Sequence, residues 1–287
     1  VTRFELTPGN HTLFNRLNRK LLERLPITSA EEVAFMREGP NSDALYRHIS
    51  RHRQESLFIF IPYPFGTSYY GMQAARDRSL LIPCLHDEAY AHTHPVRQMF
   101  PWAAGLIFNS DPERELARRL YPIETVPKAV LGMGLHPELP ADDEAFRRRL
   151  SFDSPFILSA GRKDATKNTP LLISCFERYK ERRPDSNLRL LMIGPGQVEF
   201  SHPHITDLGF LPQEEKYAAF RQARLLCNPS VNESFSIVLM EAWLSGTPAL
   251  VNAASPVTSD YVLKSEGGLL FTDYFHFEAG LDFILSR

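Results

Sequence analysis

The sequence predicts an α/β fold built from doubly wound parallel sheets. Short apolar runs that fit strands alternate with amphipathic stretches that fit helices, and most of these runs are apolar on both faces. Strands of this kind are typical of parallel sheets that helices cover on both sides. The length of 287 residues, at ~150 residues per domain, favours two domains.

Each expected strand is a short apolar run that ends at a polar or glycine-containing turn. The run 156–160 is typical, because Gly161 follows it and permits a tight turn. Strands are predicted at 57–61, 80–85, 106–108, 125–130, 156–160, 188–193, 225–227, 249–251 and 269–271.

The amphipathic stretches between these runs predict helices at 111–120, 142–150, 170–182, 213–223, 235–244, 257–264 and 277–287. Gly246, Thr247 and Pro248 end the helix at 235–244 and lead into the next strand. Residues 12–25 form a basic amphipathic helix that we expect to pack on a core. A peripheral contact with a membrane surface is the alternative for such a helix.

A glycine- and proline-rich stretch at 132–140 indicates a domain boundary near Pro140. We therefore expect one domain over residues 1–140 and a second over residues 141–287.

Composition excludes several classes of protein. Lys and Arg number 32 against 34 Asp and Glu, and the net charge of -2 gives no reason to expect nucleic acid or an anionic membrane as the main partner. The apolar runs are shorter than the ~20 residues that span a bilayer. Cys84, Cys175 and Cys227 lie singly in apolar runs, as buried small hydrophobes do. No export leader is recognised, and we expect a reducing, cytoplasmic location, with the inner face of the membrane as an alternative.

Two acids flank the start of the helix expected at 235–244. Glu233 lies in the loop before it and Glu241 within it, with seven residues between them. The N-terminus of a helix presents free N–H groups to an anion, and eight helical residues rise about 12 Å. The two acids can therefore bracket a diphosphate and accept hydrogen bonds from hydroxyls on either side. The alternative is that Glu233 caps the helix and Glu241 is solvated, but the apolar residues before Glu241 indicate a buried carboxylate that needs a partner.

Two cations follow the strand at 156–160. Arg162 and Lys167 come after Gly161, at the carboxyl end of the strand, where doubly wound sheets bind ligands. Arg offers a planar fork and Lys a point charge to phosphate oxygens. This arrangement predicts a diphosphate site, whereas either cation alone would fit a solvated loop equally well.

Four ordered segments resemble the donor domain of the family 4 (group 1) retaining glycosyltransferases. The segments are Gly161-Arg162 with Lys167, Ile193 to Gly196, Leu208 to Leu211, and Asn228 to Pro248. Members of this family have the GT-B architecture, in which two Rossmann-like domains face a cleft. The resemblance implies that residues 1–140 form the acceptor-side domain and residues 141–287 the domain that binds the nucleotide sugar.

The resemblance also implies roles for individual residues. Arg162 and Lys167 match the positions that bind the donor diphosphate, Glu233 matches the acid on the donor sugar, and Glu241 matches the acid on the ribose. Further donor contacts are implied at Gly161, Gly209, Phe210, Leu211, Ser234, Phe235 and Ser236. The family usually has glycine where this chain has Ser234 or Ser236.

His86 ends the strand at 80–85, where the family brings a histidine to the donor sugar, although a structural cap is the alternative. The implied catalytic residues are therefore His86, Arg162, Lys167 and Glu233. His92 and His94 with Asp87 and Glu88 suggest a metal site, but no second ligand cluster follows. We expect neither metal nor cofactor.

The chain departs from the family at its two ends. It opens on residues that look like the middle of an N-terminal domain, and it ends in the helix at 277–287. We expect that part of the N-terminal domain and the C-terminal tail are missing.

The predicted activity is metal-independent transfer of a sugar, with retention, from a nucleotide-diphosphate sugar to a hydroxyl of a carbohydrate, lipid or small molecule. One alternative is a nucleotide-sugar 2-epimerase of the same architecture. The other is a non-catalytic module that binds a sugar nucleotide.

Overall fold

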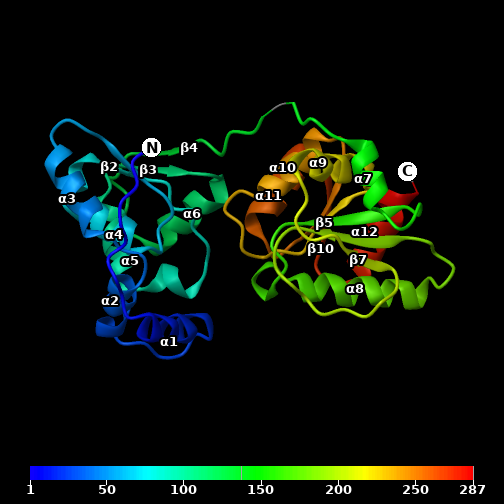
Figure 1. Cartoon of the computed structure of the whole chain (residues 1–287), viewed down its shortest axis with the longest axis horizontal. Helices are drawn as coiled ribbons and strands as arrows, with labels where there is room; N and C mark the ends of the chain where they lie inside the picture. The colour runs from blue at the N-terminus through cyan, green and yellow to red at the C-terminus, as the bar shows by residue number, and fades with distance from the viewer. Residues whose placement is uncertain (137, 287) are drawn as a thin grey trace. The chain divides into compact units, whose positions relative to one another are not determined.

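A computed structural model describes residues 1–136 and 138–286 (Figure 1). The chain divides into two compact units, Val1–Gly132 and Met133–Arg287. The division falls at the start of the glycine- and proline-rich stretch, eight residues before the predicted boundary at Pro140. Of the predicted linker, Pro137 lies outside the described residues, as does Arg287 of the last predicted helix.

The N-terminal unit contains a parallel sheet with the strand order β1-β2-β3-β4. Its strands are β1 (Phe58–Phe60), β2 (Ser79–Leu81), β3 (Gly105–Phe108) and β4 (Lys128–Val130). The α-helices are α1 (His11–Leu22), α2 (Ser29–Glu38), α3 (Asp43–His52), α4 (Gly66–Ala74), α5 (His94–Met99) and α6 (Asp111–Leu120), and the 3-10 turns are η1 (Arg76–Arg78), η2 (Ala89–His92) and η3 (Phe100–Trp102).

The core of the N-terminal unit lies between its helices and one face of this sheet. Leu17 and Leu21 of α1 are buried in the same cluster as Phe60 and Leu81 of the strands. The amphipathic N-terminal helix therefore packs on a core, as expected. We expected helices to cover both faces of the sheet. The other face of β1 does not meet this expectation, because Ile59 is 60% exposed.

β1 is one residue shorter than predicted at each end, and β2 and β4 are shorter for reasons of backbone chemistry. β2 stops at Leu81 instead of residue 85, since Pro83 has no N–H to donate and Cys84 has a φ of 54°. Cys84 is also only partly buried, unlike Cys175 and Cys227. β4 begins at Lys128 instead of residue 125, directly after Pro127.

The C-terminal unit contains a parallel sheet with the strand order β10-β9-β8-β5-β6-β7. The strands are β5 (Phe156–Ala160), β6 (Arg189–Ile193), β7 (Ile205–Asp207), β8 (Leu226–Asn228), β9 (Ala249–Asn252) and β10 (Gly268–Phe271). The helices are α7 (Asp143–Arg149), α8 (Thr169–Arg182), α9 (Gln213–Gln222), α10 (Ile237–Leu244), α11 (Pro256–Ser265) and α12 (Tyr274–Leu285), with the 3-10 turn η4 (Ala165–Lys167).

Helices cover both faces of this second sheet, as predicted for strands that are apolar throughout. Leu158 of β5 packs in a cluster with α9, α10 and α11, whereas Ile157 packs in a cluster with α8 and α12 (Figure 1). The chain runs outward from β5 through β6 to β7, and then returns to β8 on the other side of β5. Such a reversal of strand order opens a ligand-binding crevice at the carboxyl ends of the two central strands.

Candidate functional site

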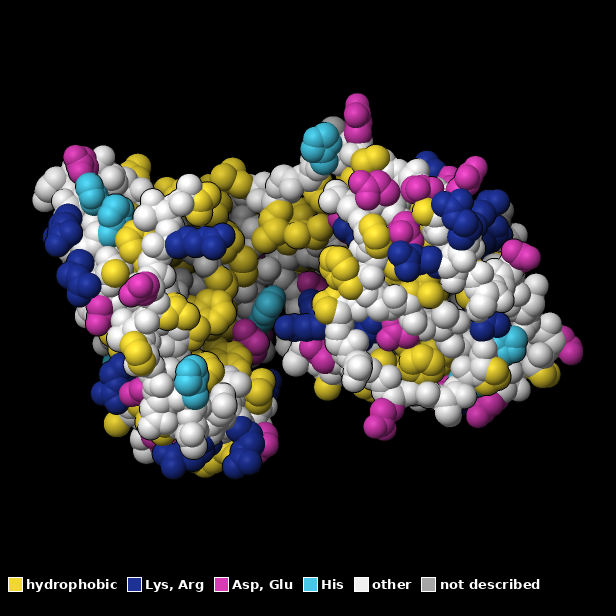
Figure 2. Space-filling model, in the orientation of Figure 1, with side chains coloured by type: hydrophobic (Ala, Val, Ile, Leu, Met, Phe, Trp, Pro, Cys, Tyr) yellow, Lys and Arg dark blue, Asp and Glu magenta, His cyan; other side chains and the backbone are white. Residues whose placement is uncertain are grey.

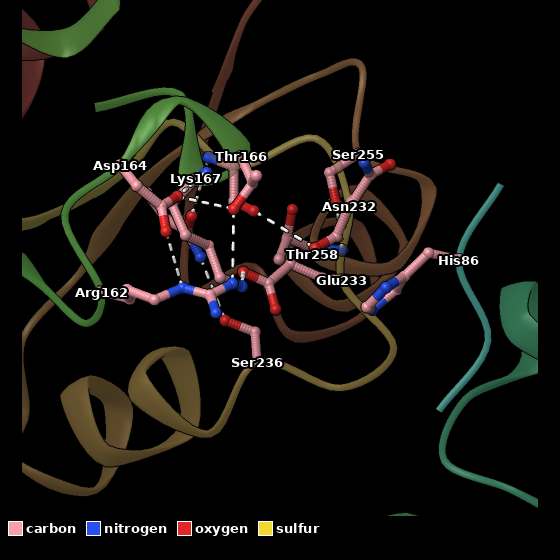
Figure 3. A network of polar contacts seen from close by, with 12 residues as sticks. His86, Arg162, Asp164, Thr166, Lys167, Asn232, Glu233, Ser236, Ser255 and Thr258 are labelled. Carbon is pink, nitrogen blue, oxygen red and sulfur yellow. Dashed lines mark hydrogen bonds and ion pairs between the residues drawn. The ribbon is translucent and has the colours of Figure 1, made fainter. Parts of the chain in front are cut away.

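The candidate site is built by the two loops at this reversal of strand order, after β5 and after β8 (Figure 3). Gly161 follows β5 with a φ of 124°, a conformation that L side chains rarely adopt. The Asn168 side chain donates a hydrogen bond to the Pro229 carbonyl over 3.2 Å and so ties one loop to the other.

Lys167 and Glu233 meet across these loops. Lys167 Nζ lies 2.8 Å from Glu233 Oε1, and the Glu233 side chain is only 11% exposed. The Lys167 backbone N–H donates to Asp164 Oδ1 over 3.0 Å, which fixes the turn η4 that carries the lysine. The predicted diphosphate cation and the predicted sugar acid therefore form one ion pair.

Arg162 joins the same cluster through Asp164. Arg162 Nε lies 2.8 Å from Asp164 Oδ2, and Nη2 donates to Thr166 Oγ1 over 3.3 Å. Partial burial raises the pKa of Asp164, but hydrogen bonds from Thr166 and from the Lys167 N–H outweigh it and hold that pKa below its usual value. The Arg162 side chain is 59% exposed, and a guanidinium has five N–H donors, so it can still bind an anion.

The N-terminus of α10 faces these loops. The helix begins at Ile237, two residues later than predicted at Phe235, because Ser236 has a φ of 71° and cannot belong to the helix. Ser234 and Ser236 are both buried, but only Ser236 has a positive φ. The Leu239 N–H already donates to the Ser236 carbonyl over 3.1 Å. The N–H groups of Ile237 and Val238 lie in the first turn of α10, where a helix has no carbonyl of its own to accept them, so they can donate to an anion.

Glu241 lies one turn into α10 and is 5% exposed. Lys216 of α9 supplies the partner that a buried carboxylate requires, with its Nζ 2.6 Å from Glu241 Oε1. Sequence reasoning predicted the need for a partner but did not identify Lys216. Lys216 lies one turn into the helix expected at 213–223, and nothing in the sequence around it indicates an ion pair with Glu241.

A cavity of about 240 Å³ opens beside this pair. It is lined in part by the predicted donor residues Gly161, Phe210, Leu211 and Glu241 and by the unpredicted Lys216. Phe210 is 81% exposed, so its ring is free to contact a ligand at the mouth of the cavity.

A buried lysine ties the loops around this cavity together. Lys163 is 3% exposed, and its Nζ donates to Asp207 Oδ1 and to the Gly194 carbonyl, each over 2.6 Å. The Gly209 N–H donates to the same Asp207 oxygen over 2.8 Å. Lys163 and Asp207 were not predicted as site residues, because the sequence alone does not reveal that the edge strand β7 exists.

His86 is carried by the N-terminal unit, in the loop after β2. Its Nδ1 lies 3.6 Å from Glu88 Oε1, which also accepts a hydrogen bond from Tyr63 over 2.8 Å. Burial raises the pKa of Glu88, but the nearby His86 side chain and the hydrogen bond from Tyr63 outweigh it and hold that pKa below its usual value. The preceding Leu85 N–H donates to the buried Glu113 over 2.6 Å, which fixes the backbone next to His86.

We next consider metal-binding groups, membrane-spanning helices and surface charge among the described residues. Among residues 1–136 and 138–286, no group of three or more His, Cys, Asp and Glu side chains is arranged to hold a metal ion. No helix of that part of the chain combines the length and apolar character needed to cross a bilayer. On the face in Figure 2, basic side chains lie among acidic ones, in line with the net charge of -2.

Comparisons with solved structures support the fold. Sucrose-phosphate synthase from Thermosynechococcus elongatus aligns with a TM-score of 0.69 at 17% identity, over 92% of this chain and 72% of that chain. The alpha,alpha-trehalose 6-phosphate synthase from Burkholderia multivorans aligns with a TM-score of 0.67 at 12% identity, over 100% of this chain and 80% of that chain. These likenesses confirm the predicted α/β fold of GT-B type.

Curated relatives are similar over part of the chain. D-inositol 3-phosphate glycosyltransferase from Corynebacterium glutamicum (strain R) is 28% identical over 61% of this chain, and its namesake from Stackebrandtia nassauensis is 30% identical over 64%. The matches span 46% of each relative, less than half of its length. The family model for glycosyl transferases group 1 matches residues 142–286. The chain therefore belongs to the group 1 glycosyl transferases.

Proposed function

We propose that this protein transfers a glycosyl group from a nucleotide-diphosphate sugar to an acceptor hydroxyl, with retention at the anomeric carbon and without a metal ion. The observation that carries the proposal is the 2.8 Å pair of Lys167 and Glu233 beside Arg162 and the N-terminus of α10. Cations, free N–H groups and an acid thereby meet at the crevice where a doubly wound sheet binds ligands.

Departure of the diphosphate is the step that these residues serve. The bond between the anomeric carbon and the phosphate oxygen breaks, and its electron pair goes to that oxygen. Lys167, Arg162 and the N–H groups of α10 would stabilise the growing negative charge. Electrostatic stabilisation of this kind is the largest catalytic term in many enzymes. The acceptor oxygen bonds to the anomeric carbon on the face that the diphosphate leaves, and the acceptor proton passes to the departing phosphate oxygen.

The acids of the site would hold hydroxyls. Glu233 is already paired with Lys167 and would accept hydrogen bonds from the donor sugar. Glu241 would hold the ribose, with the nucleoside in the cavity of about 240 Å³. That volume is below the ~300 Å³ typical of pockets that take a whole ligand, so it suits one part of the donor. We also propose that His86 contacts the donor sugar, as the family resemblance implies.

The proposal is tested by incubating the protein with a panel of nucleotide sugars and measuring release of nucleoside diphosphate with and without acceptors. D-inositol 3-phosphate is the first acceptor to test, because the relatives carry it in their names. We expect acceptor-dependent release that survives EDTA, and a product whose anomeric configuration, assigned by NMR, matches that of the donor.

Two substitutions then probe the site. Lys167→Ala and Glu233→Gln should each lower turnover by about 10²-fold or more while the protein stays folded. The matched control is Lys20→Ala, because Lys20 also pairs with a glutamate, Glu31, over 2.6 Å and is 31% exposed. Wild-type turnover in both site variants would refute the proposal.

The same experiment separates the two alternatives. Conversion of the donor to its 2-epimer in the absence of any acceptor would identify an epimerase. Tight binding of nucleoside diphosphate with no turnover of any donor would identify a non-catalytic binding module.

A further inference from the structure

Ser236 adopts a backbone conformation that costs a serine energy. Its φ of 71° and ψ of 74° place it in the left-handed region, directly before the first residue of α10. Glycine takes this conformation readily, whereas a Cβ crowds the following carbonyl. Strain of this kind persists where the surrounding structure imposes it, and it clusters at functional sites.

The hydrogen bonds around Ser236 fix the direction of its hydroxyl. Asn228 Oδ1 accepts from the Ser230 N–H over 3.0 Å, so the Asn228 amide nitrogen is the group that faces Ser236. That nitrogen can only donate, and it donates to Ser236 Oγ over 3.0 Å. The serine oxygen is therefore the acceptor in this contact, and its own proton points elsewhere.

The hydroxyl proton of Ser236 is available to a ligand. Within the described part of the chain, Ser236 Oγ is found only as an acceptor, and no protein acceptor for its proton is observed. Ser236 is 7% exposed, and Figure 3 shows its side chain turned toward the group that contains Arg162, Lys167 and Glu233. A nearly buried hydroxyl with an unused donor thus lies at the N-terminus of α10.

We propose that the Ser236 hydroxyl donates a hydrogen bond to a diphosphate oxygen of the donor, and that Asn228 positions it for that contact. This inference rests on the proposed function and adds one hydrogen-bond donor of the protein to the same site. A phosphate oxygen is a pure acceptor, which suits a hydroxyl whose oxygen is already engaged by Asn228. The strained serine is then explained as a residue that adds binding where glycine would only relieve strain.

The test compares Ser236→Ala, which removes the hydroxyl and keeps the strain, with Ser236→Gly, which removes both. Binding of UDP, GDP and ADP and of the parent nucleosides is measured by titration calorimetry, and Tm is measured in parallel. We expect both variants to bind the preferred diphosphate about 10-fold more weakly, because a hydrogen bond to a charged group is lost. Nucleoside binding should not change, and Ser236→Gly should raise Tm above that of Ser236→Ala.

Ser245→Ala is the matched control, since Ser245 caps the other end of α10 and its hydroxyl donates to the Glu241 carbonyl. Diphosphate binding equal to wild type in both Ser236 variants, with binding still weakened by Lys167→Ala, would overturn the inference and leave the proposed function intact. A wild-type protein that binds none of the diphosphates would instead contradict the proposed function.

Discussion

Glu113 makes the stability of the N-terminal unit depend on pH. This carboxyl on α6 is 1% exposed and accepts hydrogen bonds from the Leu85 and Asn109 N–H groups over 2.6 and 2.5 Å. Burial raises its pKa from 4.5 to about 7, even though those two N–H groups and the nearby His86 lower it. Protonation of Glu113 therefore acts on the backbone that carries His86.

The sign and size of the effect follow from proton linkage. The folded state binds the Glu113 proton more tightly than the unfolded state, so the added stability is complete below pH 4.5 and is lost as pH rises through about 7. The difference between 4.5 and about 7 corresponds to about 3 kcal/mol of unfolding free energy. Glu113→Gln abolishes this titration and adds a constant offset, because an amide group replaces one of the two carboxylate acceptors.

The assay is urea unfolding followed by the fluorescence of Trp102, which belongs to the N-terminal unit. The second tryptophan of the chain, Trp243, is replaced by Phe so that only Trp102 is observed. The free energy of unfolding is measured from pH 4.5 to 8 for the protein that retains Glu113 and for its Glu113→Gln variant. Glu115→Gln is the control on the same helix. The free energy of unfolding of the protein with Glu113, minus that of the Glu113→Gln variant, should fall by about 3 kcal/mol as pH rises over this range. A change below about 0.5 kcal/mol, the scatter of ordinary surface substitutions, would refute the reasoning.

Two further predictions concern the C-terminal unit and are checked by chemical unfolding. Gly194 has a φ of 116°, and an added Cβ would lie 2.1 Å from the Gly161 carbonyl oxygen, so Gly194→Ala should destabilise the unit by about 2 kcal/mol or more. An unchanged unfolding midpoint would contradict this. Lys163→Met leaves Asp207 without its cationic partner and should cost about 3 kcal/mol. Combining it with Asp207→Leu should recover only part of this loss, because the Gly209 N–H and the Gly194 carbonyl then lack their side-chain partners. If the double variant were less stable than the single one, the ion pair would not explain the loss.

The pattern of apolar runs was enough to predict the sheet of the C-terminal unit, apart from one strand. Phe156–Ala160 and Arg189–Ile193 are long and apolar, and each lies within one residue of its predicted start. Ile205–Asp207 was missed because it is short and partly polar, and its strand conformation depends on pairing with β6. Local sequence carries little information about an edge strand of this kind.

The ends of several elements were set by single backbone conformations. Arg24, with a φ of 53°, follows the end of α1 at Leu22, three residues short of the predicted end. Ser236 likewise delays the start of α10. Residues other than glycine adopt a left-handed backbone conformation where the surrounding structure imposes it. The residue types at these two positions therefore did not predict where the helices end or begin.

The sequence by itself was enough to predict which residues form the candidate site and which strand ends carry them. It placed Arg162 and Lys167 after one strand and Glu233 after another, because strand ends and helix starts follow from local pattern. Only the tertiary structure decided which charges pair. Lys167 and Glu233 are 66 positions apart and meet because β5 and β8 are neighbours in the sheet. The contacts of Lys216 with Glu241 and of Lys163 with Asp207 arise in the same way, from the packing of elements that are distant in sequence.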